Sequence, residues 1–291
     1  MTEALSLLYM FAINFAFLML CATGLIIILG MMNIINLAHG QLMMIGAYIA
    51  TIAYNHGGIP FPFAVVLSFV GVGLFGALLE KFIIRRFYGR ELGALVVTWG
   101  IGLILSQGAL LVFGPYMPPI PVPKASYQHG DITFSFYWLF LITMSILLVL
   151  GLWWIYLHTR FGMVSRATMQ NPRMARSLGV NTGKVYSLTF SIGAALAGLC
   201  GALFSPLSSI APSMGDQWVV PAFITVVIGG PANVIAGVAG SSFFLSMVQT
   251  PAAFYLGSFL GTVAMLFASL IIIRILPSGI SGFFQRMRER T

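Results

Sequence analysis

The 291-residue sequence has very few charged residues. Charged residues make up 7% of the chain and hydrophobic residues 59%, whereas soluble domains contain roughly 25% charged residues. A soluble fold of this length cannot bury that much apolar surface, because its exterior needs polar groups. The composition therefore excludes a soluble protein and predicts a membrane protein.

Acidic residues and cysteines are scarce as well. The six acids, which we expect at or near the ends of membrane spans, are Glu3, Glu80, Glu91, Asp131, Asp216 and Glu289. Proton-coupled carriers keep an acid or a histidine inside the membrane, and only His39 fits that description. No cysteine or acid stands at ligand spacing from His39, so we expect no metal site. Cys21 and Cys200 lie in apolar runs and are better explained as packed thiols than as a disulfide.

Long continuous apolar runs fill most of the chain. They are Leu5–Met32, Leu42–Tyr54, Phe63–Leu79, Leu92–Phe113, Phe134–Leu157, Val185–Phe204, Trp218–Gln249 and Ala252–Ile275. Spans of ~20 residues indicate helices, since barrel strands alternate over ~10 residues. We therefore expect an all-α, polytopic helical membrane protein in which residues 1–291 form a single transmembrane domain. The proline-rich stretch Gly114–Asp131 is expected to be an external loop.

Basic residues are clustered beside these runs. The clusters are Lys81, Arg85, Arg86 and Arg90; Arg160, Arg166, Arg173, Arg176 and Lys184; and Arg274, Arg286, Arg288 and Arg290. The positive-inside rule places all three clusters in the cytoplasm. The number of runs agrees with that placement only if Trp218–Gln249 turns back at its Gly-Gly-Pro sequence. The sequence then predicts about eight to nine crossings, a periplasmic N-terminus and a cytoplasmic C-terminus.

Two polar interruptions predict broken helices within the membrane. The first contains Asn33, Asn36, His39, Gly40 and Gln41, and the second contains Gly229, Gly230 and Asn233. Irregular backbone at membrane depth is tolerated where it faces protein or a wet cavity. These residues are therefore candidates for lining a solute path. The alternative is that they only hydrogen-bond to neighbouring helices and hold each break together.

A small-residue face follows the second basic cluster. Gly193, Ala197, Gly201 and Ser205 recur at four-residue spacing in Val185–Phe204. Such a face lets two helices approach closely. Its partner is either another helix of this chain or a second subunit.

The longest polar interval, residues 158–184, predicts a cytoplasmic loop between two spans. Within it, Asn171 can cap a short helix, Pro172 suits the first helical position, and Gly179 can end the helix in a left-handed turn. Such a helix is either a docking surface for another protein or part of a solvated basic loop. The Gly179–Lys184 sequence has the wrong spacing for a phosphate-binding loop, so we expect no nucleotide or other cofactor on this chain.

Four stretches carry a resemblance to a known family: Gly24–Tyr48, Gly162–Leu203, Val226–Gly240 and Leu276–Gly282. The chain resembles the inner-membrane permease subunit of ABC importers for branched-chain amino acids, a family that includes urea and short-amide permeases. Asn36, Ala38, His39 and Gly40 match its signature. The residues that match its ATPase-coupling loop are Gly162, Arg166, Ala167, Asn171, Ala175, Leu178 and Gly179, with Pro172 beside them. The length is that of the shorter of the two permeases.

The resemblance implies a non-catalytic subunit of a larger transporter in the bacterial inner membrane. Its expected partners are a second homologous permease, two ATPases that bind ATP and Mg, a periplasmic solute-binding protein and the lipid bilayer, with no nucleic acid. The implied solute is a branched-chain amino acid or a related small polar solute. Alternatives are a permease for urea, short amides or small organic acids, or a self-contained secondary transporter or channel.

The chain departs from the family pattern at both breaks. Gln41 stands where an acid is frequent, and Pro231-Ala232-Asn233 follows Gly230 where Gly-Ser is usual. Because both changes fall at candidate path residues, they affect the expected solute and leave the expected fold intact.

Overall fold

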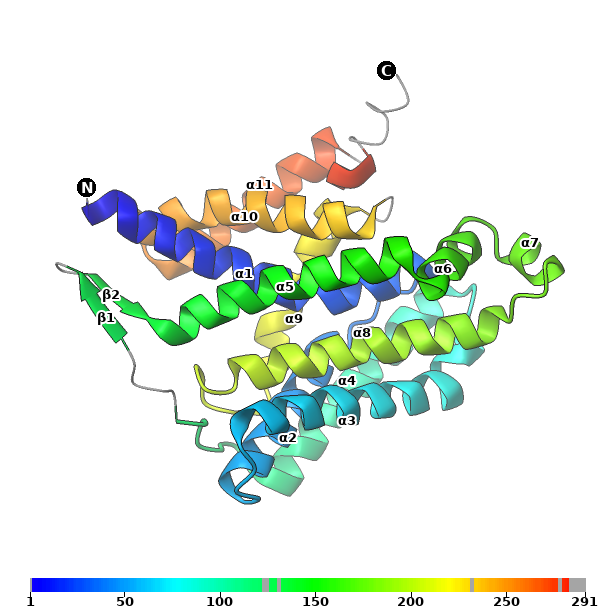
Figure 1. Ribbon diagram of the computed structural model, residues 1–291, viewed down its shortest axis with the longest axis horizontal. Coiled ribbons are helices and arrows are strands. Elements are labelled where there is room, and N and C mark those ends of the chain that lie inside the picture. The colour runs from blue at the N-terminus through cyan, green and yellow to red at the C-terminus, as the bar shows by residue number, and fades with distance from the viewer. Residues whose placement is uncertain (1, 122–125, 130–131, 231–232, 277–278, 283–291) are drawn as a thin grey trace. The chain divides into compact units, whose positions relative to one another are not determined.

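The computed structural model describes residues 2–121, 126–129, 132–230, 233–276 and 279–282, which are mostly helical (Figure 1). The elements before the coupling region are α1 (Thr2–Met32), α2 (His39–Asn55), α3 (Phe61–Phe82), the 3-10 helix η1 (Ile84–Phe87), α4 (Glu91–Phe113), β1 (Ser126–His129), β2 (Ile132–Ser135) and α5 (Phe136–His158). They are followed by α6 (Arg160–Gln170), α7 (Pro172–Ser177), α8 (Thr182–Phe204), α9 (Met214–Gly229), α10 (Val234–Leu256) and α11 (Ser258–Ile275).

Seven helices of the described residues are long and apolar enough to cross a membrane: α1, α3, α4, α5, α8, α10 and α11. This confirms an all-α, polytopic membrane protein. Two further helices could contribute to a crossing: α2, with 17 residues, and α9, a shorter apolar helix of 16 residues. The expected total of eight to nine crossings depends on these two and stays a prediction.

The structure corrects three expectations drawn from the sequence. The expected Gly114–Asp131 loop contains β1, which pairs antiparallel with β2. The last turn between spans lies at Gly257, with φ +95°, because α10 continues through Pro251; neighbouring helices can accommodate a proline in a membrane helix. Finally, α6 forms where only a loop was expected.

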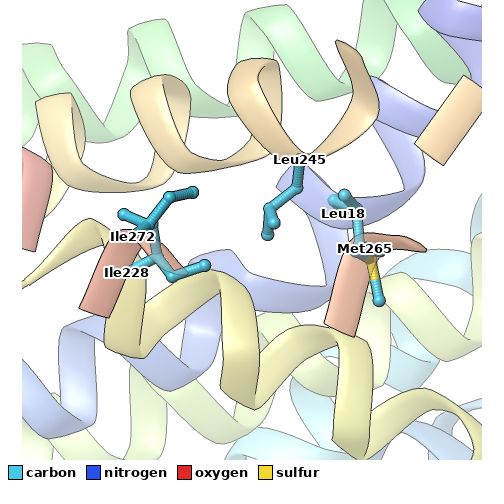
Figure 2. Packing of buried hydrophobic residues seen from close by; sticks show 5 residues of the cluster. All are labelled: Leu18, Ile228, Leu245, Met265 and Ile272. Atoms are coloured by element: carbon cyan, nitrogen blue, oxygen red, sulfur yellow. The ribbon is translucent and has the colours of Figure 1, made fainter. Parts of the chain in front are cut away.

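The described residues divide into two compact units, each assembled from distant parts of the sequence. The first unit takes residues from 1–22, 122–154 and 221–291. Its core brings together Leu18, Ile228, Leu245, Met265 and Ile272, from α1, α9, α10 and α11 (Figure 2). Asn14 also donates to the Thr250 hydroxyl at 3.0 Å, so a polar contact accompanies the apolar core.

The second unit takes residues from 23–121 and 155–220. Helix α8 packs against α2 and α3, and its glycines lie almost in contact with the neighbouring backbones. A Cβ added to Gly201 would lie 1.8 Å from the Met43 carbonyl oxygen, and one added to Gly193 would lie 2.8 Å from the Gly24 oxygen. Gly193 and Gly201 thus pack against helices of this same chain, which was one of the two alternatives for the small-residue face.

Candidate functional site

The predicted coupling loop, residues 158–184, is folded into two short helices beyond one end of α8 (Figure 1). Helix α6 starts at the Thr159 cap, whose hydroxyl accepts the Gly162 N–H at 3.1 Å. Gly162 is required here, since a Cβ would lie 2.2 Å from the Tyr156 carbonyl oxygen. The Arg166 guanidinium donates to that same oxygen and lies 5.1 Å from the centre of the Tyr156 ring. The chain therefore doubles back tightly where α5 ends.

Helix α7 follows the sequence prediction closely. The Asn171 side chain accepts the Met174 N–H at 3.0 Å, and Pro172 occupies the first turn. At the other end Gly179 has φ +85°, and the Val180 N–H donates to the Ala175 carbonyl at 3.0 Å. That pattern is a Schellman cap. The predicted capped helix over Asn171–Gly179 is confirmed.

The side chains of this segment divide into internal and external groups. Ala175 is buried, with 3% of its surface exposed. Arg176 donates to the Thr182 hydroxyl at 2.8 Å and so ties α7 to the first turn of α8. Outside, Met174 is 59% and Leu178 77% exposed. The exposed cations Arg173 and Arg176 lie on the same helix as Met174, Arg160 and Lys184 are exposed elsewhere in the segment, and Ala167 is exposed as well.

The basic cluster after α3 is partly neutralised by a buried acid. Glu80 is fully buried and pairs with Arg85 at 3.1 Å. The Tyr88 hydroxyl donates to Glu80 Oε1, the same oxygen that accepts from Arg85 Nε. Burial, and then the hydrogen bond to Glu80, raises the pKa of Tyr88. Tyr88 therefore stays neutral and keeps donating at physiological pH.

The first predicted break is real, because α1 ends at Met32 and α2 begins at His39. Asn33 turns the chain with φ +52°, and its side chain donates to Glu91 at the start of α4. Between the two helices, the Thr98 hydroxyl of α4 accepts a hydrogen bond from the Leu37 N–H at 3.1 Å and so satisfies a backbone donor of the break. Asn33 thus holds the break together.

Two helices begin side by side in the second unit. A Cβ on Gly40, in the first turn of α2, would lie 2.1 Å from the Gly215 carbonyl oxygen in the first turn of α9. Next to this contact, Gln41 Nε2 donates to Asp216 Oδ1 at 2.7 Å. The Ser106 hydroxyl of α4 donates to the Pro212 carbonyl at 2.9 Å, just before α9. The segment from α8 to α9 is therefore fixed against the start of α2.

Several buried polar atoms of α2 and of the break before it lack a hydrogen-bond partner among the described residues. They are Asn36 Nδ2, Gln41 Oε1, Tyr48 Oη and Thr51 Oγ1. Gln41 is 3% and Asn36 1% exposed. The other Asn36 side-chain atom, Oδ1, accepts the Ala38 N–H at 3.1 Å. His39 is also fully buried here.

The second predicted break also forms, although Pro231 and Ala232 lie outside the described residues. Gly230 has φ +73°, and its carbonyl accepts the Ser281 hydroxyl at 3.0 Å. Asn233 caps α10 by accepting the Ala236 N–H at 3.2 Å. Gly229 lies against Gly237, where an added Cβ would lie 2.8 Å from the backbone. The described residues of this break are held by the Asn233 cap, by the hydrogen bond from the distant Ser281 and by close packing.

Sequence reasoning brought together the residues of each break but missed their partners. Asp216 was expected near a span end, yet it contacts Gln41, which lies beside the middle of α4. The short polar run before Trp218 gave no sign that Asp216 lies so far from the ends of the spans. Met174 was missed because a single methionine in the sequence suggests only an apolar side chain that packs in the interior. Within the coupling segment, several predicted residues shape the fold. Asn171 and Gly179 are exposed but cap α7, whereas Ala167 and Leu178 are exposed without a capping role.

Comparison with known proteins identifies the family. Residues 7–276 match the family described as branched-chain amino acid transport system permease component. The chain belongs to this family. The match confirms the resemblance drawn from the sequence and makes the protein a non-catalytic permease subunit of a transport system in the membrane.

Two relatives match this chain over most of their length, and a third matches over less than half of its own. The probable branched-chain amino acid transport permease protein LivH of Methanocaldococcus jannaschii is 29% identical, covering 91% of this chain and 88% of the relative. LivH of Escherichia coli K12, a high-affinity system permease, is 27% identical over 90% of each chain. The autoinducer 2 import system permease LsrC of Yersinia pseudotuberculosis matches 58% of this chain at 29% identity, covering 45% of its own length. No solved structure matches.

Proposed function

We propose that this permease forms the transmembrane path of an ABC importer for branched-chain amino acids or a related small polar solute. Two separate ATPases, which bind ATP and Mg, drive it. A second homologous permease completes the path, and a periplasmic binding protein delivers the solute. The three basic clusters and the C-terminus face the cytoplasm, and the N-terminus faces the periplasm. The relatives named for branched-chain amino acids support this choice of solute.

The observation that carries the proposal is the exposed apolar pair on the coupling segment. Met174 and Leu178 lie one helical turn apart on a short helix outside the long spans, and both are more than half exposed. Neither is needed inside the fold, since Ala175 makes the inward contact of α7. An exposed apolar pair flanked by cations suits a protein partner with an apolar hollow and an acidic rim.

Force applied to α7 has two routes into the membrane helices. Arg176 connects α7 to α8 through Thr182, and Arg166 connects α6 to the end of α5 through Tyr156. Coupling requires only that the ATPases bind this segment differently in their two nucleotide states. The segment therefore has the connections that a transmission element needs.

The path itself is proposed at the first break. Asn36, His39, Gly40 and Gln41 are buried there, and the side chains of Asn36 and Gln41 retain unpaired polar atoms. Gly229, Gly230 and Asn233 are less suited to solute contact, because local hydrogen bonds and packing account for them. Asn33 is likewise accounted for by Glu91.

The test is Leu178→Asp in the assembled transporter. We expect solute uptake to fall at least about 10-fold, since an apolar contact in a docking site contributes about 1–3 kcal/mol, and the ATPases should no longer co-purify with the permease. Ser177→Asp is the matched control, because Ser177 is exposed on the same helix and gains the same charge.

Ala175→Glu is a less informative test of docking, because it places a charge on the buried side of α7 and disrupts the fold. Normal uptake and ATPase capture by Leu178→Asp would refute the docking assignment. The competing secondary transporter or channel predicts solute movement by the purified chain alone in liposomes, whereas the importer model predicts none.

A further inference from the structure

The contact between Gln41 and Asp216 lies near the middle of a membrane span. A Cβ added to Gly102 would lie 3.5 Å from Gln41 Cγ, and Gly102 is at the middle of the 23-residue helix α4. At a rise of 1.5 Å per residue, each end of α4 is roughly 16 Å away. Asp216 Oδ1 is 2.7 Å from Gln41 Nε2, so its carboxylate lies at similar depth.

An exposed carboxylate at this depth needs water or a polar partner. The Asp216 side chain is exposed on this chain, and acids within membrane spans face a bundle interior or a wet cavity because lipid does not solvate them. Gln41 is its one hydrogen-bonded side chain among the described residues. The face that carries Asp216 therefore points into the transporter and away from lipid.

The surroundings of the carboxylate favour a ligand that donates hydrogen bonds. Gln41 Oε1, an acceptor, is buried without a hydrogen-bond partner within the part of the chain that the structure describes, and it would lie 2.5 Å from a Cβ on Gly215. Unpaired buried acceptors are costly, so a site that keeps one is typically completed by a ligand or water. An ammonium group carries three donors and one positive charge, which suits this amide oxygen together with the Asp216 carboxylate.

A role for Asp216 at the start of α9 explains only part of this arrangement. Asp216 is in the first turn of α9, where a negative charge interacts favourably with the helix dipole. That interaction accounts for an acid at this position. It does not account for a buried glutamine whose nitrogen is committed to the acid while its oxygen has no partner.

We propose that Gln41 and Asp216 form the point in the translocation path that binds the ammonium group of the transported amino acid. The proposal rests on the function proposed above. It names Asp216 as the charge-bearing residue for recognition and Gln41 as the residue that positions its carboxylate. It predicts a solute with a cationic amine over neutral urea or an organic acid.

The first experiment tests the position of Asp216 and needs no transport. In membranes containing the whole transporter, Cys21 and Cys200 are replaced by alanine, and Asp216→Cys is treated with a charged, membrane-impermeant methanethiosulfonate. The matched control is Ile104→Cys, which is 72% exposed on α4, two residues beyond Gly102. We expect position 216 to react at least about 10-fold faster than position 104, because lipid excludes the charged reagent. Equal rates would overturn the proposal by placing Asp216 against lipid or inside a subunit contact.

The second experiment tests recognition. Asp216→Asn should raise the KM for leucine uptake about 10-fold or more, the scale of one charge-assisted hydrogen bond, while the ATPases still co-purify. Gln41→Leu should raise the KM as well, and Asp216→Glu should recover part of the loss. Glu3→Gln, an equal charge change at an exposed residue of the first turn of α1, should have no effect.

An unchanged KM in Asp216→Asn, with active wild-type uptake, would refute recognition by this residue and leave the importer assignment standing. If Asp216 had a purely structural role, Asp216→Asn would lower the maximal rate of uptake and the protein yield but leave the KM unchanged. A wild-type transporter that moves neutral amides but not amino acids would overturn the choice of ligand, even if position 216 is labelled.

Discussion

The two helix breaks have similar sequences but different structures. Both interrupt apolar helices with glycine and asparagine. At the second, the Asn233 cap and the hydrogen bond from Ser281 to Gly230 stabilise the described residues of the break. At the first, another helix start lies in contact through Gly215, and Asn36 and Gln41 keep buried atoms without a hydrogen-bond partner in the described part of the chain. Unsatisfied polar groups, more than the interruption itself, distinguish a candidate binding place from a structural turn.

The largest effect is expected at the contact between the two helix starts. Gly40→Ala places a Cβ 2.1 Å from the Gly215 oxygen, so α2 and α9 can no longer approach each other and the folded protein should be lost. Gly100→Ala on α4 is the control, since nothing lies within 4 Å of its added Cβ. Yield and thermal unfolding in detergent measure both variants. If Gly40→Ala unfolds at the same temperature as Gly100→Ala, the two helix starts are not in close contact.

A smaller effect is expected at the second break. Asn233→Ala removes the α10 cap and should reduce the free energy of unfolding by about 1 kcal/mol. The KM for solute should not change, because this residue is assigned to holding the helix. Asn233→Asp keeps an acceptor for the Ala236 N–H and should recover the stability. A raised KM in Asn233→Ala with unchanged stability would place the second break in the path as well.

The smallest effect is expected at Asn33. Asn33→Gly loses the side-chain bond to Glu91 but fits the φ of +52° without strain. The free energy of unfolding should therefore change by no more than about 0.5 kcal/mol, and uptake should stay normal. Asn33→Val is the contrast, since a β-branched residue is strained at positive φ. If glycine is as damaging as valine, the Glu91 bond matters more than the backbone turn.

Local signals in the sequence predicted much of the molecule. Apolar length identified the spans, and Asn171, Pro172 and Gly179 predicted a helix that the structure confirms in each detail. These features succeed because each depends on neighbours within a few residues. The same reasoning located both breaks from their glycines and asparagines.

What the sequence could not show depends on contacts between distant residues. Asp216 and Gln41 are 175 positions apart, so nothing near either residue revealed their pairing or their depth. The exposure of Met174 and the burial of Ala175 also escaped prediction, because both depend on how α7 packs. The hairpin of β1 and β2 was missed because prolines dominate the stretch before it.

The close packing of α8 limits how this protein can move. Where a glycine lies directly against a neighbouring backbone, as Gly201 does against Met43, a sliding helix would force its Cα atom against a carbonyl oxygen at once. A displacement delivered to the first turn of α8 through Arg176 and Thr182 should therefore carry α2 and α3 along with it as one rigid block. Substitutions that uncouple ATP hydrolysis from uptake without unfolding the chain are therefore expected in the first turn of α8, before the helix reaches Gly193 and Gly201.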